Sequence, residues 1–233
     1  MLTITKIKKA ITNLANLERA EACRRYFKTA KGEYGYGDVF IGVTVPELRK
    51  VAKKFAGLDL KEIDLLIKNK IHEYRFVALQ ILVLKYKEGD DRLKKKIISY
   101  YFKNKKYINN WDLVDTSAPY ILGDWLVNKD KSVLLKLSKS KNLWDKRIAI
   151  LATFAFIRKN DFEYSFNFAT SLMTDKHDLI HKALGWMLRE IGKRSEQELK
   201  DFLEKNCHKM PRTMLRYAIE RFDKDYRKMI LAK

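Results

Sequence analysis

Residues 109–125, with the sequence NNWDLVDTSAPYILGDW, bring an indole, carboxylates and a proline close together. Trp111 and Asp115 are four residues apart, so on a helix their side chains project from the same face. A carboxylate placed there can stabilise positive charge that develops during a reaction, or orient a water molecule, and an indole face can hold a cationic group. A helix that merely packs a half-buried tryptophan and exposes an aspartate has the same spacing, so the segment alone leaves both interpretations open.

The candidate acid lies just before a predicted break in the helix. Pro119 follows Asp115 by four residues and lacks the N–H that would bond to the Asp115 carbonyl, so we expect a kink there. Asp112 and Asp124 share the segment, where each could cap a helix or pair with a neighbouring lysine. The rest of the chain must decide between these roles.

The chain as a whole has the pattern of an all-α protein. It contains three prolines and nine glycines in 233 residues, and apolar residues recur at intervals of three and four. We expect a helical pair in 3–29 that is broken near Asn16, and a helix from Thr44 to about Phe55. The glycine-rich loop 31–42 lacks a GK[ST] motif and a preceding strand, so a nucleotide-binding loop is not expected. A plain connector is favoured over a nucleic-acid contact.

Basic residues open several apolar helices at a regular interval. Arg75, Arg147, Lys182 and Arg216 are separated by 72, 35 and 34 residues, which gives a unit of about 35 residues with one more unit near 111–115. Paired helices repeating at this period are typical of an α-solenoid of stacked antiparallel helix pairs. The sequence therefore predicts one domain over 1–233, with the four basic residues in register along a concave basic groove.

The charge of the chain indicates a polyanionic partner. Lysine and arginine total 49 against 29 acidic residues, a formal charge of +20. Nucleic acid fits such a field best, ahead of an anionic membrane surface, a ribosome or an acidic protein, although a lysine-rich proteome would also produce it. A carboxylate among phosphate-binding residues weakens the binding of nucleic acid, so Asp115 indicates a catalytic role. The reaction that fits is cleavage of an N-glycosidic bond, which builds positive charge on the sugar.

Other classes of protein have less support. The two cysteines are far apart and lack zinc-ligand spacing, so we expect a reducing compartment and neither a disulfide nor a metal site. A metal-dependent nuclease would need a further carboxylate beside Asp112 and Asp115. The N-terminal segment lacks the apolar core of a signal peptide and the longest apolar run is too short to span a bilayer, so we expect a cytoplasmic protein.

These residues resemble the HEAT-like-repeat DNA glycosylases of alkylation repair, which excise alkylated purines. The resemblance covers nearly the whole chain and rests on RYFKT, FIGVTVPELRK, NWDLVDTSAPYILGDW, NLWDKRIAI and KALGWMLREIGKR. The combination of WDxVD, the following proline with LGD, and GWxLRE is specific to that family. Asn110 departs from members that have a second tryptophan there, and the loop 31–42 is glycine-rich where others are shorter.

The resemblance implies a catalytic role for three residues. Asp115 matches the catalytic aspartate, Trp111 matches the tryptophan that packs beside the damaged nucleotide, and Trp186 matches a second such tryptophan. It further implies a monofunctional hydrolase that acts on cationic N3- and N7-alkylpurines in duplex DNA, without deep base flipping, metal or cofactor. A positively charged base is already a good leaving group, so no general acid is required.

The resemblance also implies DNA contacts at four positions and leaves two alternatives open. Arg147 matches a phosphate-contacting arginine and Tyr26 an aromatic at the edge of the site, and we expect Lys182 and Arg189 to contact DNA as well. We expect a monomer that binds double-stranded DNA. The alternatives are a non-catalytic binder of duplex DNA structures and a solenoid scaffold for acidic proteins.

Overall fold

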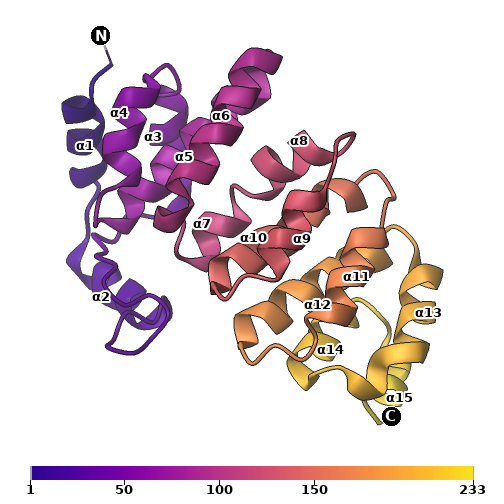
Figure 1. The fold of residues 1–233 in the computed structure, drawn as a ribbon. Coiled ribbons are helices and arrows are strands. Elements are labelled where there is room, and N and C mark those ends of the chain that lie inside the picture. The colour runs from indigo at the N-terminus through magenta and orange to yellow at the C-terminus, as the bar shows by residue number, and fades with distance from the viewer. Residues whose placement is uncertain (1, 233) are drawn as a thin grey trace. The chain divides into compact units, whose positions relative to one another are not determined.

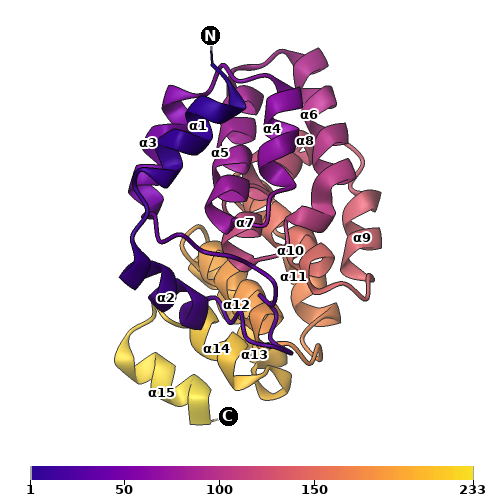
Figure 2. The same ribbon diagram turned by 90° about the vertical axis from the view of Figure 1, so that its left-hand side faces the viewer.

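The computed structural model describes residues 2–232, which fold into helices joined by turns and loops (Figures 1 and 2). Among these residues there is no β-strand, and an isolated parallel bridge joins Val39 to Ile71. The prediction of an all-α protein is therefore confirmed. Over the same residues, no helix combines the length and apolar character that a membrane crossing requires.

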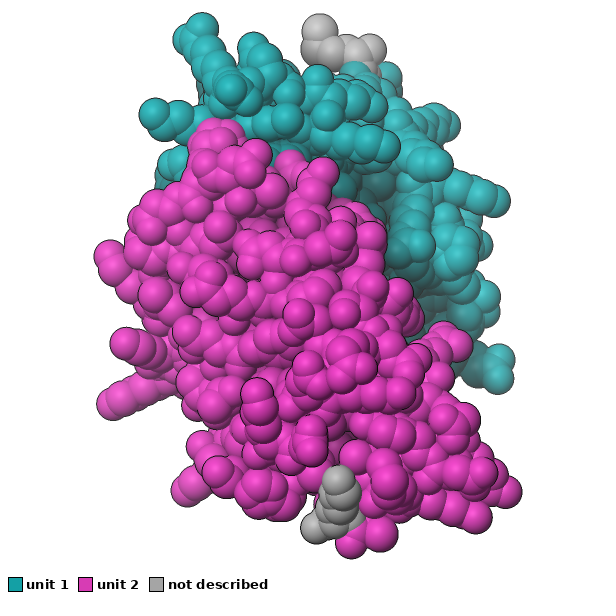
Figure 3. Space-filling view, turned by 90° about the vertical axis from the view of Figure 1, so that its right-hand side faces the viewer, with its two compact units in different colours: residues 1–117 teal, residues 118–233 magenta. Residues whose placement is uncertain are grey.

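The helices form two compact units, Met1–Ser117 and Ala118–Lys233, which Figure 3 colours separately. We describe each unit by itself. The prediction of one domain over 1–233 and that of a concave basic groove stay predictions.

Unit 1 contains seven α-helices and one 3-10 turn in the part that the structure describes. They are α1 (Ile4–Thr12), α2 (Leu17–Tyr26), α3 (Val45–Lys54), α4 (Leu60–Ile67), α5 (His72–Glu88), α6 (Asp91–Asn104), the turn Lys105–Tyr107 and α7 (Trp111–Asp115).

Local sequence explains where the first helices begin. The side chain of Asn16 caps α2 by accepting from the Arg19 N–H at 2.8 Å, which confirms the predicted break between α1 and α2. Thr44 and Glu47 form a capping box at the start of α3, with Pro46 in its first turn. The predicted helix from Thr44 to about Phe55 is confirmed as well.

Helix α5 forms the centre of unit 1. It packs against α3, α4, α6 and α7, and most of its residues between His72 and Leu82 are buried. Because α5 is covered on several sides, it buries polar residues as well as apolar ones. Since α5 contacts both α3 and α7, it connects the loop before α3 to the helix that carries Asp115.

Unit 2 begins where α7 has ended. Its elements are the π-helical turn Pro119–Gly123, α8 (Asp124–Leu126), α9 (Ser132–Ser138), α10 (Leu143–Ile157), α11 (Glu163–Ser171), α12 (Asp178–Gly192), α13 (Glu196–Asn206), the 3-10 turn Cys207–Lys209, α14 (Arg212–Ala218) and α15 (Lys224–Ala232). The predicted disruption at Pro119 is thus stronger than a kink, because the α-helix stops at Asp115 and the Gly123 N–H bonds to the Ala118 carbonyl at 2.9 Å.

Unit 2 has the packing expected of stacked helix pairs. Helix α9 packs against α10 and α11 against α12, and in turn α10 packs against α12 and α12 against α14. In unit 1, α3, α5 and α7 make the corresponding row, since α5 contacts both of the others. The helices that hold the regularly spaced residues 75, 147, 182 and 216 are α5, α10, α12 and α14, so the repeat read from the sequence coincides with these rows.

Candidate functional site

Helix α7 carries Trp111 at its first position and Asp115 at its last. Both side chains are half-buried, and the backbone turns away from the helix at Thr116, whose N–H donates to the Asp112 carbonyl at 3.1 Å. A carboxylate at the C-terminal end of a helix gains nothing from the helix dipole. The helix dipole therefore does not explain an acid at position 115.

Three aromatic rings gather at the start of α7. Trp111 stacks on Phe27 with 5.2 Å between ring centroids and an interplanar angle of 11°. Tyr26, the last residue of α2, meets Trp111 edge-on at 5.8 Å and is 67% exposed. The structure thus brings the predicted site residues Tyr26 and Trp111 into contact, with the tyrosine on the solvent side.

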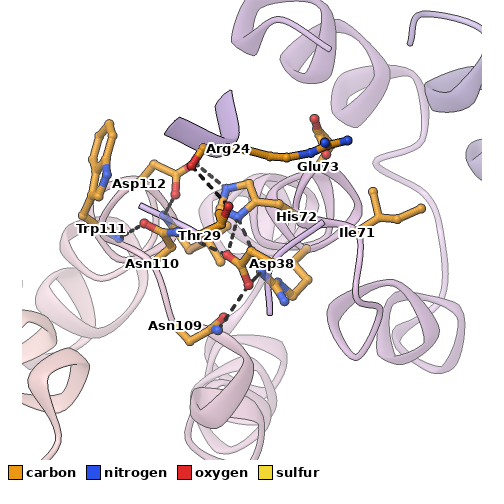
Figure 4. Close-up of polar contacts among 12 residues, drawn as sticks. Arg24, Thr29, Asp38, Ile71, His72, Glu73, Asn109, Asn110, Trp111 and Asp112 are labelled. Atoms are coloured by element: carbon orange, nitrogen blue, oxygen red, sulfur yellow. Dashed lines mark hydrogen bonds and ion pairs between the residues drawn. The ribbon is translucent and has the colours of Figure 1, made fainter. Parts of the chain in front are cut away.

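A buried ionic network lies behind these rings (Figure 4). His72, at the first position of α5, bridges two carboxylates: its Nδ1 lies 3.1 Å from Asp38 and its Nε2 lies 2.8 Å from Asp112. All three side chains are almost fully buried. Asp38 belongs to the loop 31–42 and Asp112 to α7, so the imidazole joins the loop to the helix of the candidate acid.

Asp38 also receives donors from an arginine and two asparagines. Arg75 Nη2 donates to its Oδ1 at 2.6 Å, Asn110 Nδ2 donates to its Oδ2 at 3.2 Å, and Asn109 Nδ2 lies 3.4 Å from its Oδ1. A buried carboxylate needs such donors because it has lost its hydration. Asn110 is fully buried and serves as the N-cap of α7.

The charges of the network hold its members ionised. Burial by itself would lower the pKa of His72, but the charges and hydrogen bonds of Asp112 and Asp38 outweigh burial and raise the pKa to about 9. Burial would raise the pKa of Asp38, yet the bond to His72 and the charge of Arg75 lower it to about 2. At neutral pH His72 is therefore an imidazolium beside the ionised Asp38.

This network fixes the start of α7. Asp112 is the residue after Trp111, and its Oδ1 accepts the Leu113 N–H at 2.9 Å while its Oδ2 bonds to His72. The network consequently sets the orientation of the first turn of α7, which carries Trp111, and one turn later Asp115. Figure 4 shows Asp112, Asn110 and Trp111 side by side at the edge of this cluster.

A cavity of about 240 Å³ opens beside the network within unit 1. Its walls are mainly apolar, and its titratable side chains are those of Arg19, Cys23, His72, Glu73 and Asp112. Glu73 is 2% exposed and uses Oε1 to accept the N–H groups of Ile41 and Gly42 at 3.0 and 2.8 Å. Burial, followed by the charges of Glu73 and Asp112, raises the pKa of the Cys23 thiol, which makes it a poor nucleophile.

Two members of the predicted basic row are buried. Arg75 is 5% exposed and bonds to Asp38, and Arg147 is 4% exposed and donates from Nη1 to the Leu179 carbonyl. The prediction of one exposed row of four bases is therefore wrong at these positions, because each guanidinium satisfies buried acceptors inside its own unit. A phosphate contact by Arg147 stays a prediction.

Trp186 occupies the middle of α12 in unit 2. It is half-buried, its Nε1 donates to Glu190 at 3.0 Å, and its ring lies 6.2 Å from that of Phe154 on α10. The residue before it is Gly185, where a Cβ would stand 2.5 Å from the Met214 carbonyl oxygen of α14. The glycine in GWMLRE thus lets α14 approach α12 next to the tryptophan.

The two other predicted DNA contacts of unit 2 are partly exposed and paired with acids. Lys182 Nζ lies 2.7 Å from Asp178. Arg189 forms an ion pair with Glu220 and lies 3.7 Å from Glu190. Partly exposed pairs of this kind contribute little to stability.

The network that holds α7 was not predicted from the sequence. Asp38 lies in the loop 31–42, which was expected to be a connector, His72 had no predicted role, and Asp112 was expected to cap a helix or to pair with a lysine. The one available signal was Asp112 itself, a second acid one turn before Asp115 in a segment whose apolar neighbours are buried.

Among residues 2–232, no three histidine, cysteine, aspartate or glutamate side chains are arranged to hold a metal ion.

Comparisons with known proteins agree on one family and one fold. Residues 7–222 match the model of a family described as DNA alkylation repair enzyme. A solved structure described as a predicted DNA alkylation repair enzyme from Enterococcus faecalis is similar with a TM-score of 0.68 and 18% identity, over 90% of this chain and 97% of that one. AlkD2 from Streptococcus mutans gives a TM-score of 0.57 and 16% identity, over 94% and 97%. The search of curated proteins found no match.

Proposed function

Because the chain belongs to the DNA alkylation repair enzyme family, we propose that it is a DNA glycosylase which hydrolyses the N-glycosidic bond of cationic N3- and N7-alkylpurines in duplex DNA. The products are the free base and an abasic site, with the strands intact. A monomeric state and a cytoplasmic location belong to the same proposal.

One observation carries this proposal: Asp115 and Trp111 lie one turn apart on a helix whose first turn is fixed by a buried network. A reaction that creates a sugar cation needs a carboxylate held in place before the charge appears, since reorganisation during the reaction would cost rate. Tyr26 adds an exposed aromatic edge beside Trp111, where a nucleotide could pack. A plain packing helix would need neither the network nor the acid.

The proposed reaction needs only water and the side chains of the protein. The bond between sugar C1′ and the purine nitrogen breaks, its electron pair leaves with the base, and the cationic alkylpurine departs as a neutral molecule. Asp115 stabilises the resulting oxocarbenium-like sugar and orients the water whose oxygen bonds to C1′, and the proton of that water passes to solvent. Trp111 packs beside the damaged nucleotide and holds its cationic ring.

For unit 2 the proposal assigns four contacts. Trp186 packs against the damaged nucleotide, and Arg147, Lys182 and Arg189 contact the DNA backbone. Of these, Arg147 is 4% exposed, and its guanidinium also donates to the Leu179 carbonyl. Its replacement would therefore affect folding of unit 2 as well as DNA binding.

The experiment is a base-release assay on duplexes with a single N7-methylguanine or N3-methyladenine. Asp115→Asn keeps the size of the side chain and removes its charge, so we expect release to fall by about 10²-fold or more. Affinity for the same duplex should stay equal or rise, because a charge that opposes the phosphates is gone. Asp124→Asn, an exposed acid of the same segment, is the matched control and should keep wild-type release.

Each result assigns a different function. Release by the wild type that Asp115→Asn does not reduce would remove Asp115 from the mechanism. Strong, salt-dependent binding without any released base would replace the proposal by the non-catalytic binder of duplex DNA. Weak binding at physiological salt would favour the scaffold for acidic proteins.

A further inference from the structure

The end of α2 holds a lysine in a backbone conformation that favours glycine. The N–H of Thr29 bonds to the Arg24 carbonyl at 3.1 Å and that of Lys28 to the Arg25 carbonyl at 3.3 Å, which is the pattern of a Schellman cap. Lys28 occupies the left-handed position of this cap with a φ of 55°. Only Asn160 shares a positive φ among the other described residues that are not glycine.

A lysine at this position is unfavourable for stability, so another reason for it is needed. A side chain with a Cβ is strained in the left-handed region, whereas glycine adopts it freely. Strain of this kind is commonly kept where a side chain has a function. Lys28 is exposed, and none of the carboxylates that the structure describes forms an ion pair with it.

The chain that follows Lys28 is held rigidly against it. Gly35 donates its N–H to the Lys28 carbonyl at 2.9 Å, and a Cβ on Gly35 would stand 2.3 Å from the Phe27 carbonyl oxygen. Two residues further, Gly37 has a φ of 91°, and Asp38 then enters the buried network. The residue between these two glycines is Tyr36, which is 64% exposed.

The loop therefore presents cations and an aromatic ring to solvent on a fixed backbone. Arg24, Arg25, Lys28 and Lys31 are all exposed in this segment. Of the nearby acids, Glu21 pairs with Arg24 and Glu33 accepts the Ala30 N–H, both at the surface. Tyr26, at the end of the same helix, contacts Trp111. A loop that served only as a connector would not need a strained lysine or an exposed tyrosine.

We propose that residues 24–37 are a second contact for the sugar–phosphate backbone of duplex DNA, in which Lys28 binds a phosphate and Tyr36 packs against an adjacent sugar. The proposal rests on the proposed function, because it takes duplex DNA as the substrate. A cation on a preorganised backbone binds a phosphate with little loss of freedom, and each phosphate contact releases counterions. The segment sets where the duplex lies, and Asp115 acts on the sugar.

The test uses three variants and unmodified duplex DNA. Lys28→Gly removes the charge and relieves the strain, and Tyr36→Ala removes the ring. Asn160→Gly is the control, since it relieves a smaller strain of the same kind at a neutral residue. Thermal unfolding, the dissociation constant at several salt concentrations, and single-turnover base release at saturating protein are measured for each.

We expect Lys28→Gly to unfold about 2 to 4 °C higher than wild type and yet to bind DNA more weakly. Its slope of log K against log salt should be smaller in magnitude by about 0.9. Tyr36→Ala should weaken binding about three- to tenfold without changing the melting temperature. Base release at saturation should equal that of wild type for both, because neither residue touches the reacting atoms.

The control separates charge from backbone strain. Asn160→Gly should also unfold at a higher temperature but bind DNA as wild type does. Wild-type affinity and salt slope in both Lys28→Gly and Tyr36→Ala would overturn the proposal. Since these readouts use unmodified duplex, an absence of base release by wild type would refute the glycosylase and leave the DNA contact standing.

Discussion

Helices α7 and α12 each carry a predicted site tryptophan, and they hold it by different physical means. Helix α7 has five residues, and buried charges tie it to α5 and to the loop 31–42. Helix α12 has fifteen residues and is held by packing, with Gly185 against the backbone of α14. Trp111 is thus held by a buried ionic network, whereas Trp186 lies on a helix held by close packing. The first arrangement should respond to charge and pH, and the second to side-chain size.

The largest effect is expected from removing His72, the cation at the centre of the network that holds α7. His72→Ala leaves two buried carboxylates facing each other, so we expect the free energy of unfolding to fall by about 3 to 5 kcal/mol in urea at pH 7. His208→Ala, which truncates an exposed histidine, should change it by less than about 0.5 kcal/mol. If His72→Ala proved as stable as the control, the network would contribute nothing to the position of α7.

The pH dependence of stability should distinguish the two arrangements next. The folded pKa of His72 is raised to about 9 from an ordinary value of 6.5, so its stabilisation is complete below pH 6.5 and is lost as the pH rises through about 9. The loss should be on the order of 3 kcal/mol. Urea unfolding at pH 6 and pH 9.5 measures it, with His72→Gln as the reference that lacks this titration. Parallel pH profiles of the two proteins would mean that folding does not shift the pKa of His72.

At acid pH the same network should weaken through Asp38. Its pKa is lowered from 3.8 to about 2, so its contribution is present above pH 3.8 and is lost as the pH falls through 2. In unit 2 the Trp186 Nε1 donates to Glu190, a half-buried carboxylate that pairs with Arg189 and Lys193 and not with a buried histidine.

The packing of α12 should be sensitive to the size of the side chain at position 185, whereas α7 should be sensitive to the charge of its network. Gly185→Ala puts a Cβ against the backbone of α14, so we expect a loss of about 1 to 3 kcal/mol in the free energy of unfolding. Gly192→Ala in the same helix meets only the flexible end of Leu199 and should be neutral or stabilising. Equal effects at both glycines would show that the approach of α14 is not what constrains Trp186.

The smallest expected effect concerns the surface of α12. Lys182→Ala removes a partly exposed ion pair with Asp178, so the free energy of unfolding should change by less than about 0.5 kcal/mol. If Lys182 contacts a phosphate, the slope of log K against log salt for duplex DNA should be smaller in magnitude by about 0.9. An unchanged slope would remove Lys182 from the proposed contacts while leaving the role of Trp186 untouched.

The sequence predicted the helices better than it predicted their polar contacts. Helix starts at Asn16 and Thr44, the break at Pro119 and the spacing of α10, α12 and α14 follow from local chemistry and period, which a single sequence contains. The pairing of Asp38 with His72 joins residues 34 apart, and that of His72 with Asp112 joins residues 40 apart. No local pattern encodes such pairs.

The error at Arg75 and Arg147 has a related cause. Periodicity gives the position of a residue along a helix, but the depth of burial depends on what the neighbouring elements offer to a charged group. Arg75 donates to Asp38 and Arg147 donates to the Leu179 carbonyl, so two cations that were expected on a surface lie inside their units. For Trp111 and Tyr26 the sequence named the residues, and the structure supplied Phe27 as the ring between α2 and α7.

The shortness of α7 has a consequence for how the protein opens. A helix of five residues cannot persist without its surroundings, so the hydrogen-exchange protection of amides such as Val114 and Thr116 depends on the bridge through His72. Local unfolding of the loop 31–42 would release Asp38 and, with it, the first turn of α7. The two segments, more than 70 residues apart in the chain, would then exchange as one cooperative unit while α5 stays folded.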